Sequence, residues 1–324
     1  MRYRILGRTG LRVSEIGLGC WALGGVGWGP VDDRDSLATI RRAVDCGITF
    51  FDTSDSYGNG HSEELIGRAL EGVTADVVIC TKGGILPEAA RQDFSAAHLT
   101  RALDQSLRRL RREHVDLYLL HNPDRETLDR GEAFHTLERL RRDGKLRHWG
   151  VSVRPRRSWR SPPSGASEDP VADARWLIED GRAAAIELVY NMLEPEAATV
   201  FDLAATRGTG LIARVPLASG LLTGKFSANI EFPKGDFRRR WPPEELSADL
   251  ASLARIRDLP ALRDLDVVQA ALQFCLWHPA VAVTIPGART PAQVERNASA
   301  AMLSRFEPGL VADVVARGRV MSAN

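Results

Sequence analysis

Short apolar runs alternate with helix-length amphipathic segments along most of this 324-residue chain. Eight of the runs have the composition of buried strands, at residues 15–21, 49–54, 76–82, 115–121, 146–152, 185–191, 210–216 and 280–287. Most of them are continuously hydrophobic rather than alternating, which is typical of parallel strands covered on both faces. The chain is therefore predicted to be an α/β protein with a parallel sheet.

Between these runs, apolar residues recur at the three- and four-residue spacing of helices, in segments 35–47, 61–72, 99–113 and 126–144. Gly47 is a typical helix stop, and Ser62 with the two acids after it is expected to cap the second segment. Eight strands alternating with helices fit either a doubly wound sheet or a closed barrel. Their number, and the length from residue 15 to residue 287, favour the (β/α)8 TIM barrel.

The remaining segments add two features to this barrel. Residues 2–17 (RYRILGRTGLRVSEIG), with a turn at 7–10, predict a short N-terminal β-hairpin at the barrel floor. Insertions at 154–170 and 225–246 follow strands, so both are expected as long loops on the C-terminal rim, where barrel active sites are built. The first is expected to be a substrate lid or a loop without fixed structure. No change in composition divides the chain, so residues 1–324 are predicted to form one domain.

Composition argues against several classes of function. Lys and Arg total 43 and Asp and Glu total 42, so the net charge of +1 offers no field to attract nucleic acid or an anionic membrane. The N-terminus has charges inside its only apolar patch, unlike a signal peptide, and no apolar run approaches the ~18 residues of a membrane span. The cysteines lack metal-ligand spacing and suit a reducing cytosol as free thiols: Cys20, Cys46, Cys80 and Cys275. A cytoplasmic location is expected, and nothing in the sequence indicates an oligomeric state.

Polar side chains end three consecutive predicted strands. Asp52 closes the second strand, and Tyr57 follows it in the next loop. Lys82 closes the third strand and His121 closes the fourth. Because neighbouring strands of a barrel end on the same rim, these four side chains are expected to lie together. A satisfied polar turn, a metal site and a proton-transfer site are the alternatives for this group.

The residue types favour proton transfer. A metal site would need more His, Cys or carboxylate ligands and no lysine to repel the cation, so no metal is expected. A Schiff-base lysine would leave Tyr57 and Asp52 without a role. An ammonium beside a phenol favours the phenolate and lowers its pKa from ~10, and Asp52 is expected to pair with Lys82. With His121 donating to a carbonyl oxygen or sharing the Tyr57 proton, the group predicts a general acid for carbonyl reduction, or a base for the reverse reaction.

Motifs spread over nearly the whole chain resemble those of a known family. They are LGRTGLRVSEIGLG, FFDTSDSYGNGHSEELIG, TK at 81–82, DLYLLHNPD, GKLRHWGVS, VYNML, PLASGLLTGKF and IPGARTPAQVERN. In these motifs the chain is similar to the aldo-keto reductases, NADP(H)-dependent oxidoreductases on a (β/α)8 barrel. The resemblance implies a small-molecule carbonyl or alcohol substrate. It also implies a catalytic tetrad of Asp52, Tyr57, Lys82 and His121, with Tyr57 as the acid/base.

The resemblance further implies how NADP(H) is held. The last strand and the following helix are expected to bind the adenosine 2′-phosphate end through Gly287, Ala288, Arg289, Gln293 and Asn297. Arg289 is the natural partner of that phosphate, at a helix N-terminus. The motifs around the last two strands add Pro216, Leu217, Gly220, Leu222 and Ile285 to the expected cofactor-binding residues. No GxGxxG motif follows a strand, so a Rossmann-type site is not expected.

Three positions depart from the family pattern around the nicotinamide, where a Ser-Asn pair, a Gln and an aromatic residue are usual. This chain has Ser152-Val153, Glu187 and Arg214 there. Ser152 can still bind the carboxamide, but the Val153 side chain cannot form a hydrogen bond. Glu187 and Arg214 lie on neighbouring strands and are expected to pair, with the guanidinium replacing the aromatic face. The alternative is that Arg214 points into solvent.

Loop residues complete the expected site. Lys225 and Arg238, in the insertion after strand seven, are expected to clamp the cofactor pyrophosphate. Trp21 and Trp28 are expected to line the substrate pocket, unless they belong to the core. The complete tetrad favours an enzyme over a second hypothesis, a family-like nucleotide-binding or regulatory protein with little turnover. A metal-dependent barrel hydrolase is a third hypothesis.

Overall fold

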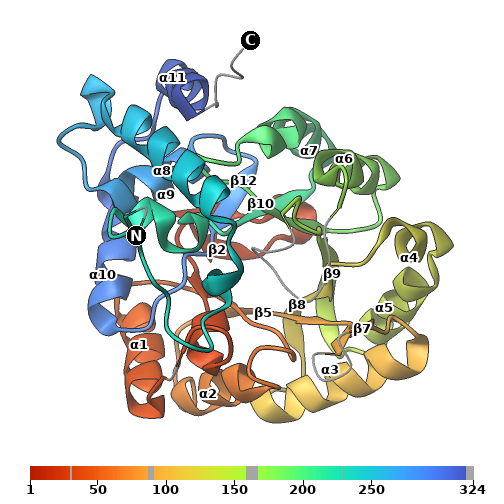
Figure 1. Ribbon diagram of the computed structural model, residues 1–324. Coiled ribbons are helices and arrows are strands. Elements are labelled where there is room, and N and C mark those ends of the chain that lie inside the picture. The colour runs from red at the N-terminus through yellow and green to blue at the C-terminus, as the bar shows by residue number, and fades with distance from the viewer. Residues whose placement is uncertain (30, 87–90, 158–166, 228, 319–324) are drawn as a thin grey trace.

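Eight parallel strands curl around the centre of the molecule, with helices outside them (Figure 1). The computed structural model describes residues 1–29, 31–86, 91–157, 167–227 and 229–318. The strands are β3 (Leu18–Gly19), β4 (Phe50–Asp52), β5 (Val78–Gly83), β8 (Val115–His121), β9 (Leu146–Ser152), β10 (Ala185–Val189), β11 (Gly210–Arg214) and β12 (Val281–Thr284).

The strands pair in chain order, and backbone contacts join the first to the last. Parallel bridges link Ile16 to Thr284 and Gly19 to Gly287, and the Gly17 N–H donates to the Thr284 carbonyl at 2.8 Å. The predicted (β/α)8 barrel is confirmed, since each strand is hydrogen-bonded to its neighbour and the sheet curls back on itself. That residues 1–324 form a single domain stays a prediction.

Helices follow the strands, and the four segments predicted from the apolar spacing are helical over most of their length. They are α1 (Asp33–Asp45), α2 (His61–Ala69), α3 (Ala96–Leu110), α4 (Arg125–Arg130), α5 (Glu132–Arg142), α6 (Pro170–Asp180), α7 (Phe201–Arg207), α8 (Pro243–Arg257), α9 (Val267–Leu276), α10 (Pro291–Ser299) and α11 (Pro308–Gly318). Segment 126–144 forms two helices, because Gly131 adopts a left-handed conformation (φ 69°) between them. No helix in the described ranges is both long and apolar enough to cross a membrane.

The expected cap of α2 is wrong. This helix begins after Gly60 without a side-chain cap. The Ser62 hydroxyl instead donates to the Cys20 carbonyl at 2.9 Å, and the fully buried Glu63 accepts from Thr81 and Arg109. Both side chains face the barrel wall, so the first turn of α2 supplies a buried polar contact rather than an exposed cap.

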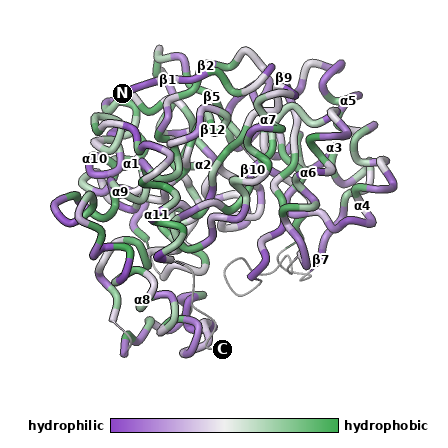
Figure 2. Tube along the Cα trace, turned by 90° about the horizontal axis from the view of Figure 1, so that it is seen from above, coloured by the Kyte–Doolittle hydropathy of each residue, from purple (hydrophilic) through white to green (hydrophobic). Residues whose placement is uncertain are grey.

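The predicted N-terminal hairpin is present and lies at the amino ends of the strands. β1 (Tyr3–Ile5) pairs antiparallel with β2 (Arg12–Ser14), and Leu6 and Val13 are fully buried in the cluster that fills the barrel interior. Figure 2 shows hydrophobic residues mostly on the strands and inner helix turns, with hydrophilic residues along the outer helices and loops. The floor of the barrel is therefore apolar packing, and polar groups gather at the opposite end.

Short elements cover that opposite rim. An antiparallel pair that the sequence did not predict, β6 (Ile85–Leu86) and β7 (Arg91–Gln92), follows β5. The 3₁₀ segment η6 (Ala218–Thr223) follows β11, and the insertion at 225–246 contains η7 (Phe237–Arg240). Within the other insertion, residues 158–166 lie outside the described residues, so the lid prediction is untested. Among the described residues, further 3₁₀ segments are η1 (Gly7–Thr9), η2 (Trp21–Gly24), η5 (Glu196–Val200), η8 (Pro260–Leu262) and η9 (Ala300–Met302).

Candidate active site

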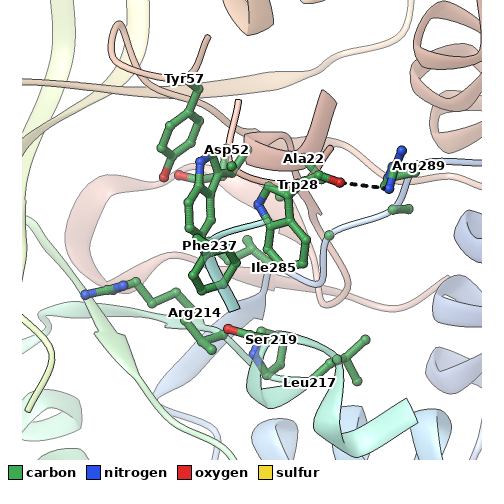
Figure 3. Close-up of a pocket in the computed structure, with 18 of the residues that line it drawn as sticks. Ala22, Trp28, Asp52, Tyr57, Arg214, Leu217, Ser219, Phe237, Ile285 and Arg289 are labelled. Carbon is green, nitrogen blue, oxygen red and sulfur yellow. Dashed lines mark hydrogen bonds between the residues drawn. The ribbon is translucent and has the colours of Figure 1, made fainter. Parts of the chain in front are cut away.

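A cavity of about 560 Å³ lies at the carboxyl ends of the strands. Figure 3 shows Asp52 and Tyr57 at one end and Arg289 at the other, with Trp28 and Phe237 between them. The cavity therefore has a proton-handling end, an aromatic middle and a basic end.

Beneath the proton-handling end of the cavity, Lys82 contacts two buried carboxylates. Its ammonium contacts the Asp52 carboxylate, lies 3.3 Å from Glu187 Oε2, and donates to the Thr53 carbonyl at 3.1 Å. The predicted Asp52–Lys82 pair is thus present. Burial by itself lowers the pKa of Lys82, but the Asp52 and Glu187 carboxylates outweigh burial and raise that pKa well above its usual value. Lys82 is fully buried and touches the cavity only through its neighbours.

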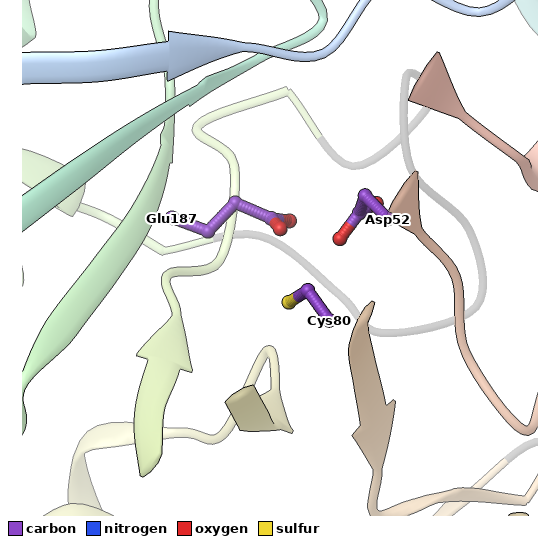
Figure 4. A group of neighbouring side chains, drawn as sticks. All are labelled: Asp52, Cys80 and Glu187. Carbon is purple, nitrogen blue, oxygen red and sulfur yellow. The ribbon is translucent and has the colours of Figure 1, made fainter. Parts of the chain in front are cut away.

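Asp52 and Glu187 bring two carboxylates to one ammonium. Burial and the nearby Glu187 charge raise the pKa of Asp52 to about 8, against the lowering effect of Lys82. With Cys80, these two residues form a cluster whose ligand-type atoms lie within 4.8 Å of one another (Figure 4). The Lys82 ammonium already takes the position of a cation between the carboxylates, so the cluster does not have the chemistry of a metal site.

Tyr57 lies directly over this charge network. Lys82 Nζ is 5.4 Å from the centre of its ring, and the His121 ring approaches edge-on with centroids 5.8 Å apart. Burial raises the pKa of the phenol above its usual value, and the opposing effect of Lys82 is smaller. The expected lowering of this pKa is therefore wrong for this structure, because desolvation of the phenolate exceeds its attraction to the ammonium. Tyr57 holds its proton and has the state of an acid.

His121 is neutral and has a partner that the sequence did not indicate. Its Nδ1 atom lies 3.1 Å from Ser54 Oγ. Burial, followed by the charges of Lys82 and Arg214, lowers the pKa of the imidazole well below its usual value. Because Nδ1 is engaged with Ser54, Nε2 is the ring nitrogen that remains to meet a ligand.

The expected pairing of Glu187 with Arg214 is present. Arg214 Nε lies 3.7 Å from Glu187 Oε1, and Arg214 Nη2 donates to the Val153 carbonyl at 2.8 Å and to Asn122 Oδ1 at 3.2 Å. Arg214 is buried and lines the cavity, so the alternative that it points into solvent is wrong. Ser152 donates to Glu187 Oε1 at 2.9 Å and lies behind it, outside the cavity wall.

Aromatic side chains form the middle of the cavity. The Trp21 ring stacks near Tyr57 with centroids 6.1 Å apart, and it packs edge-on against Trp28 at 5.3 Å. Both tryptophans line the cavity, as expected for pocket walls. Their loop lies tightly against that of Tyr57, since a side chain on Gly58 (φ 62°) would come within 2.3 Å of the Gly24 carbonyl oxygen.

The basic end lies beside the start of α10. Arg289 Nη1 donates to the Trp28 carbonyl at 3.1 Å, and Asn297 Nδ2 donates to the Gly287 carbonyl at 3.4 Å. Arg238 is held by both oxygens of Asp236, at 2.9 and 2.6 Å. The expected cofactor residues that line the cavity are Glu187, Arg214, Pro216, Leu217, Gly220, Lys225, Arg238, Ile285, Gly287, Ala288, Arg289, Gln293 and Asn297. Leu222 does not line it, because this side chain is fully buried in the hydrophobic core.

The sequence interpretation missed several residues of the cavity. Asn122 directly follows His121 on the same strand end and was open to the same reasoning. Phe237 and Arg296 reach the cavity from a loop and a helix far along the chain, and no local pattern marks them, whereas Arg240 belongs to the same basic run as the expected Arg238. Ser54 contacts His121 without lining the cavity, and it was missed because a serine in a strand-end turn has an ordinary explanation in turn chemistry.

Comparison with known proteins agrees with this geometry. The family model described as "Aldo/keto reductase family" matches residues 15–315. Aldo-keto reductase YhdN of Bacillus subtilis is 31% identical over 309 residues, covering 91% of this chain and 87% of that protein. A probable voltage-gated potassium channel subunit beta of Oryza sativa is 28% identical, covering 93% and 91%. The structure of the glycerol dehydrogenase AKR11B4 from Gluconobacter oxydans matches with a TM-score of 0.79 at 29% identity, covering 99% of this chain and 98% of that one.

Proposed function

The chain belongs to the aldo/keto reductase family, and we propose that it uses NADP(H) to reduce the carbonyl of an aldehyde, ketone or sugar to an alcohol, or to catalyse the reverse reaction. The observation that carries the proposal is the single cavity that joins Tyr57, His121 and the buried Asp52–Lys82 pair to a basic end. A hydride carrier and a proton donor must meet at one carbonyl, and a cavity with these two ends supports that reaction.

The residues present fit a dinucleotide phosphate. Besides Arg214, the described cations that line the cavity are Lys225, Arg238, Arg240, Arg289 and Arg296. Cations beside a helix N-terminus favour phosphate groups, and Arg289 is suited to a 2′-phosphate, which supports NADP(H) rather than NAD(H). The Val153 side chain cannot form a hydrogen bond, and the Val153 carbonyl accepts from Arg214, which also donates to Asn122 Oδ1.

In the proposed mechanism the bound nicotinamide supplies the hydride for reduction and accepts it in the reverse direction. Tyr57 gives its hydroxyl proton to the carbonyl oxygen as that oxygen gains negative charge. The phenolate that remains is stabilised by the Lys82 ammonium, which Asp52 holds in place. His121 Nε2 donates a hydrogen bond that orients the carbonyl, and Trp21 and Trp28 exclude water from it.

A panel of aldehydes, ketones and aldoses, followed by NADPH and NADH absorbance, tests the proposal. We expect turnover of at least one carbonyl class, with NADPH preferred, and its loss in Tyr57→Phe. Turnover that survives in Tyr57→Phe would contradict the assigned acid. The Arg289→Ala variant should narrow the preference for NADPH over NADH if this residue meets the 2′-phosphate.

A second candidate function is regulation by a bound nucleotide with little turnover. The similar channel subunit beta favours this candidate, because it shows that related chains carry names other than those of reductases. Tight NADPH binding without oxidation by any member of the panel would support it. The complete set of Asp52, Tyr57, Lys82 and His121 favours the enzyme.

A further inference from the structure

A hydrogen-bonded chain leads from His121 away from the cavity. His121 Nδ1 lies 3.1 Å from Ser54 Oγ, and Ser54 Oγ lies 3.2 Å from Asp55 Oδ1. Ser54 is fully buried, so solvent does not interrupt the chain at its middle atom. The proposed mechanism gives neither Ser54 nor Asp55 a task.

Asp55 faces a second buried polar group behind the strands. Glu63 and Tyr118 are fully buried, and Glu63 accepts a hydrogen bond from Arg109 at 2.7 Å. A Cβ atom on Gly83 would lie 2.0 Å from the Tyr118 hydroxyl and 3.5 Å from Asp55 Oδ2. The glycine therefore lets the phenol and the carboxyl approach the same point on β5. This group is separate from the Asp52–Lys82–Glu187 network.

The single hydroxyl proton of Ser54 can serve only one acceptor at a time. If Ser54 donates to His121, Nδ1 is the bare nitrogen of the neutral ring and Nε2 carries the proton. If Ser54 donates to Asp55, Ser54 Oγ accepts from Nδ1–H, and Nε2 is bare. The first arrangement makes Nε2 a hydrogen-bond donor toward the cavity, and the second makes it an acceptor.

We propose that Ser54 and Asp55 are positioning residues that set the tautomer of His121, with a protonated Asp55 directing the Ser54 hydroxyl to Nδ1 and an ionised Asp55 drawing it away. The protonated acid can itself donate to Ser54 Oγ, which leaves the serine proton for the imidazole. The ionised carboxylate is the strongest acceptor within reach of that serine and takes its proton in a charge-assisted bond. The expected effect on turnover rests on the proposed function. The tautomer of His121 does not, because it can be measured whether or not the protein is an enzyme.

The charges around this chain place the switch in an accessible range. Burial and the Glu63 carboxylate raise the pKa of Asp55 to about 8, while Ser54 and Arg109 oppose the rise. Tyr118 on β8 faces the same carboxyl group, and the Asp55 N–H donates to the Lys82 carbonyl at 3.2 Å. His121 itself faces Tyr57, Lys82 and Arg214, and the two cations keep the ring neutral whichever tautomer it adopts.

Ser56 and the backbone compete for the same hydroxyl. Ser56 Oγ lies 2.9 Å from Ser54 Oγ, and the Lys82 carbonyl oxygen lies 3.5 Å from it. The Ser56 N–H also donates to Ser54 Oγ at 3.2 Å. The Ser56 N–H takes one lone pair of Ser54 Oγ, and Nδ1–H or the protonated Asp55 takes the other, so both arrangements form without a bond from the Ser56 hydroxyl. A Ser56→Ala variant tests whether it controls the switch instead.

Nitrogen NMR of the histidine rings tests the tautomer directly. Protein labelled with ¹⁵N-histidine, free of nucleotide, is compared at pH 6 and pH 9.5, and His121 is identified as the signal that His121→Asn lacks. In the wild type we expect the proton on Nε2 at pH 6 and on Nδ1 at pH 9.5, with a midpoint near the Asp55 pKa of about 8. A wild-type ring with one tautomer at both pH values overturns the proposal.

Variants separate the positioning role from general damage to the fold. Asp55→Asn keeps the size of the side chain but does not titrate, so the His121 tautomer should be the same at both pH values. Asp93→Asn, a rim carboxylate bonded to the Ser95 N–H, is the matched control and should leave the switch intact. A switch that persists in Asp55→Asn, or that is lost in Ser56→Ala alone, contradicts the assignment to Asp55.

A kinetic experiment with the panel of aldehydes, ketones and aldoses tests the effect of the tautomer on turnover. Reduction by the wild type should fall as the pH rises past the switch, because Nε2 no longer donates, and Asp55→Asn should lose this step while retaining turnover. If NMR shows the switch but no carbonyl is reduced, the proposed function fails and the tautomer inference stands. If turnover is normal and the ring does not switch, the inference alone fails.

Discussion

The two ends of the barrel both bury carboxylates, but they pair them differently. At the floor, Glu15 is fully buried, and its oxygens accept from Arg2 at 2.9 Å, from Arg4 at 2.7 Å and from Arg305. At the mouth, which is the rim at the carboxyl ends of the strands, Asp52 and Glu187 share the Lys82 ammonium. Three cations surround one carboxylate at the floor, whereas two carboxylates meet one ammonium at the mouth.

We interpret this as the difference between a structural contact at the floor and a proposed catalytic contact at the mouth. The floor cluster joins residues 2, 4, 15 and 305, so it ties the N-terminal hairpin to a distant part of the chain. At the mouth, the pKa values of Asp52 and Tyr57 are raised and that of His121 is lowered. Such shifted groups gathered in a cavity are typical of catalytic sites. Loss of the floor contact should therefore reduce stability, and loss of the mouth contact should reduce turnover.

The largest effect is expected for Lys82→Met. Carbonyl reduction should fall about 10³-fold, within the usual range for loss of acid–base catalysis. Without the ammonium, the pKa of Asp52 rises further above that of the unfolded chain, so the folded state loses stability as the pH rises through this pKa. Urea unfolding should show a larger deficit at pH 9 than at pH 6. A deficit independent of pH would contradict the shared-ammonium interpretation.

The floor is tested by Glu15→Gln. The free energy of unfolding should fall by about 3 kcal/mol, because the arginines lose a buried counter-charge. The rate of carbonyl reduction should stay within about twofold, since none of the four residues of this cluster lines the cavity. Glu138→Gln is the matched control, since its pair with Arg141 is exposed and should cost at most about 0.5 kcal/mol. Equal losses of unfolding free energy in the two variants would show that the buried cluster stabilises the fold no more than an exposed ion pair does.

The raised pKa of Asp55 predicts that the stability of the wild type and that of Asp55→Asn differ by an amount that changes with pH. Its folded pKa of about 8 exceeds the unfolded value, so its contribution to stability is full below the unfolded pKa of ~3.9 and is lost as the pH rises through 8. Asp55→Asn does not titrate, so it should gain on the wild type by up to about 1.4 kcal/mol per pH unit. Unfolding free energies at pH 5.5, 6.5 and 7.5 measure this gain. Parallel pH profiles for the two proteins would contradict the raised pKa.

The smallest effects concern Arg214 and Glu187. Arg214→Ala should weaken NADPH binding about tenfold, or 1.4 kcal/mol, because it removes a guanidinium held against the cavity. Glu187→Gln should weaken it less, since an amide oxygen can still accept from Ser152. Fluorescence titration measures both affinities. Unchanged affinity in both variants would remove these residues from the cofactor site.

Much of the barrel and its rim could be predicted from the sequence. Continuous apolar runs marked the parallel strands, and the rule that such strands end on one rim brought Asp52, Tyr57, Lys82 and His121 together. The same rule placed Glu187 beside Arg214, on adjacent strands. These inferences depend only on the order of the strands in the sheet, which is the same as their order along the chain.

Effects that depend on surroundings in three dimensions could not be predicted. The direction of the Tyr57 pKa shift follows from the balance between burial and one ammonium, and the sequence does not give the depth of burial. Ser62 and Glu63 read as a helix cap, but the turn of α2 aims them at Cys20 and Arg109. Phe237 reaches Trp21 through the fold of a rim loop, with ring centroids 4.9 Å apart.

One paired measurement tests the division of roles most directly. Tyr57→Phe and Glu15→Gln are compared with the wild type for the rate of carbonyl reduction, the NADPH dissociation constant and the free energy of unfolding. We predict that Tyr57→Phe loses about 10²- to 10⁴-fold in rate, with NADPH affinity and stability little changed, and that Glu15→Gln shows the reverse pattern. A Tyr57→Phe rate within tenfold of the wild type, at full stability, would contradict the assignment of Tyr57 as the proton donor.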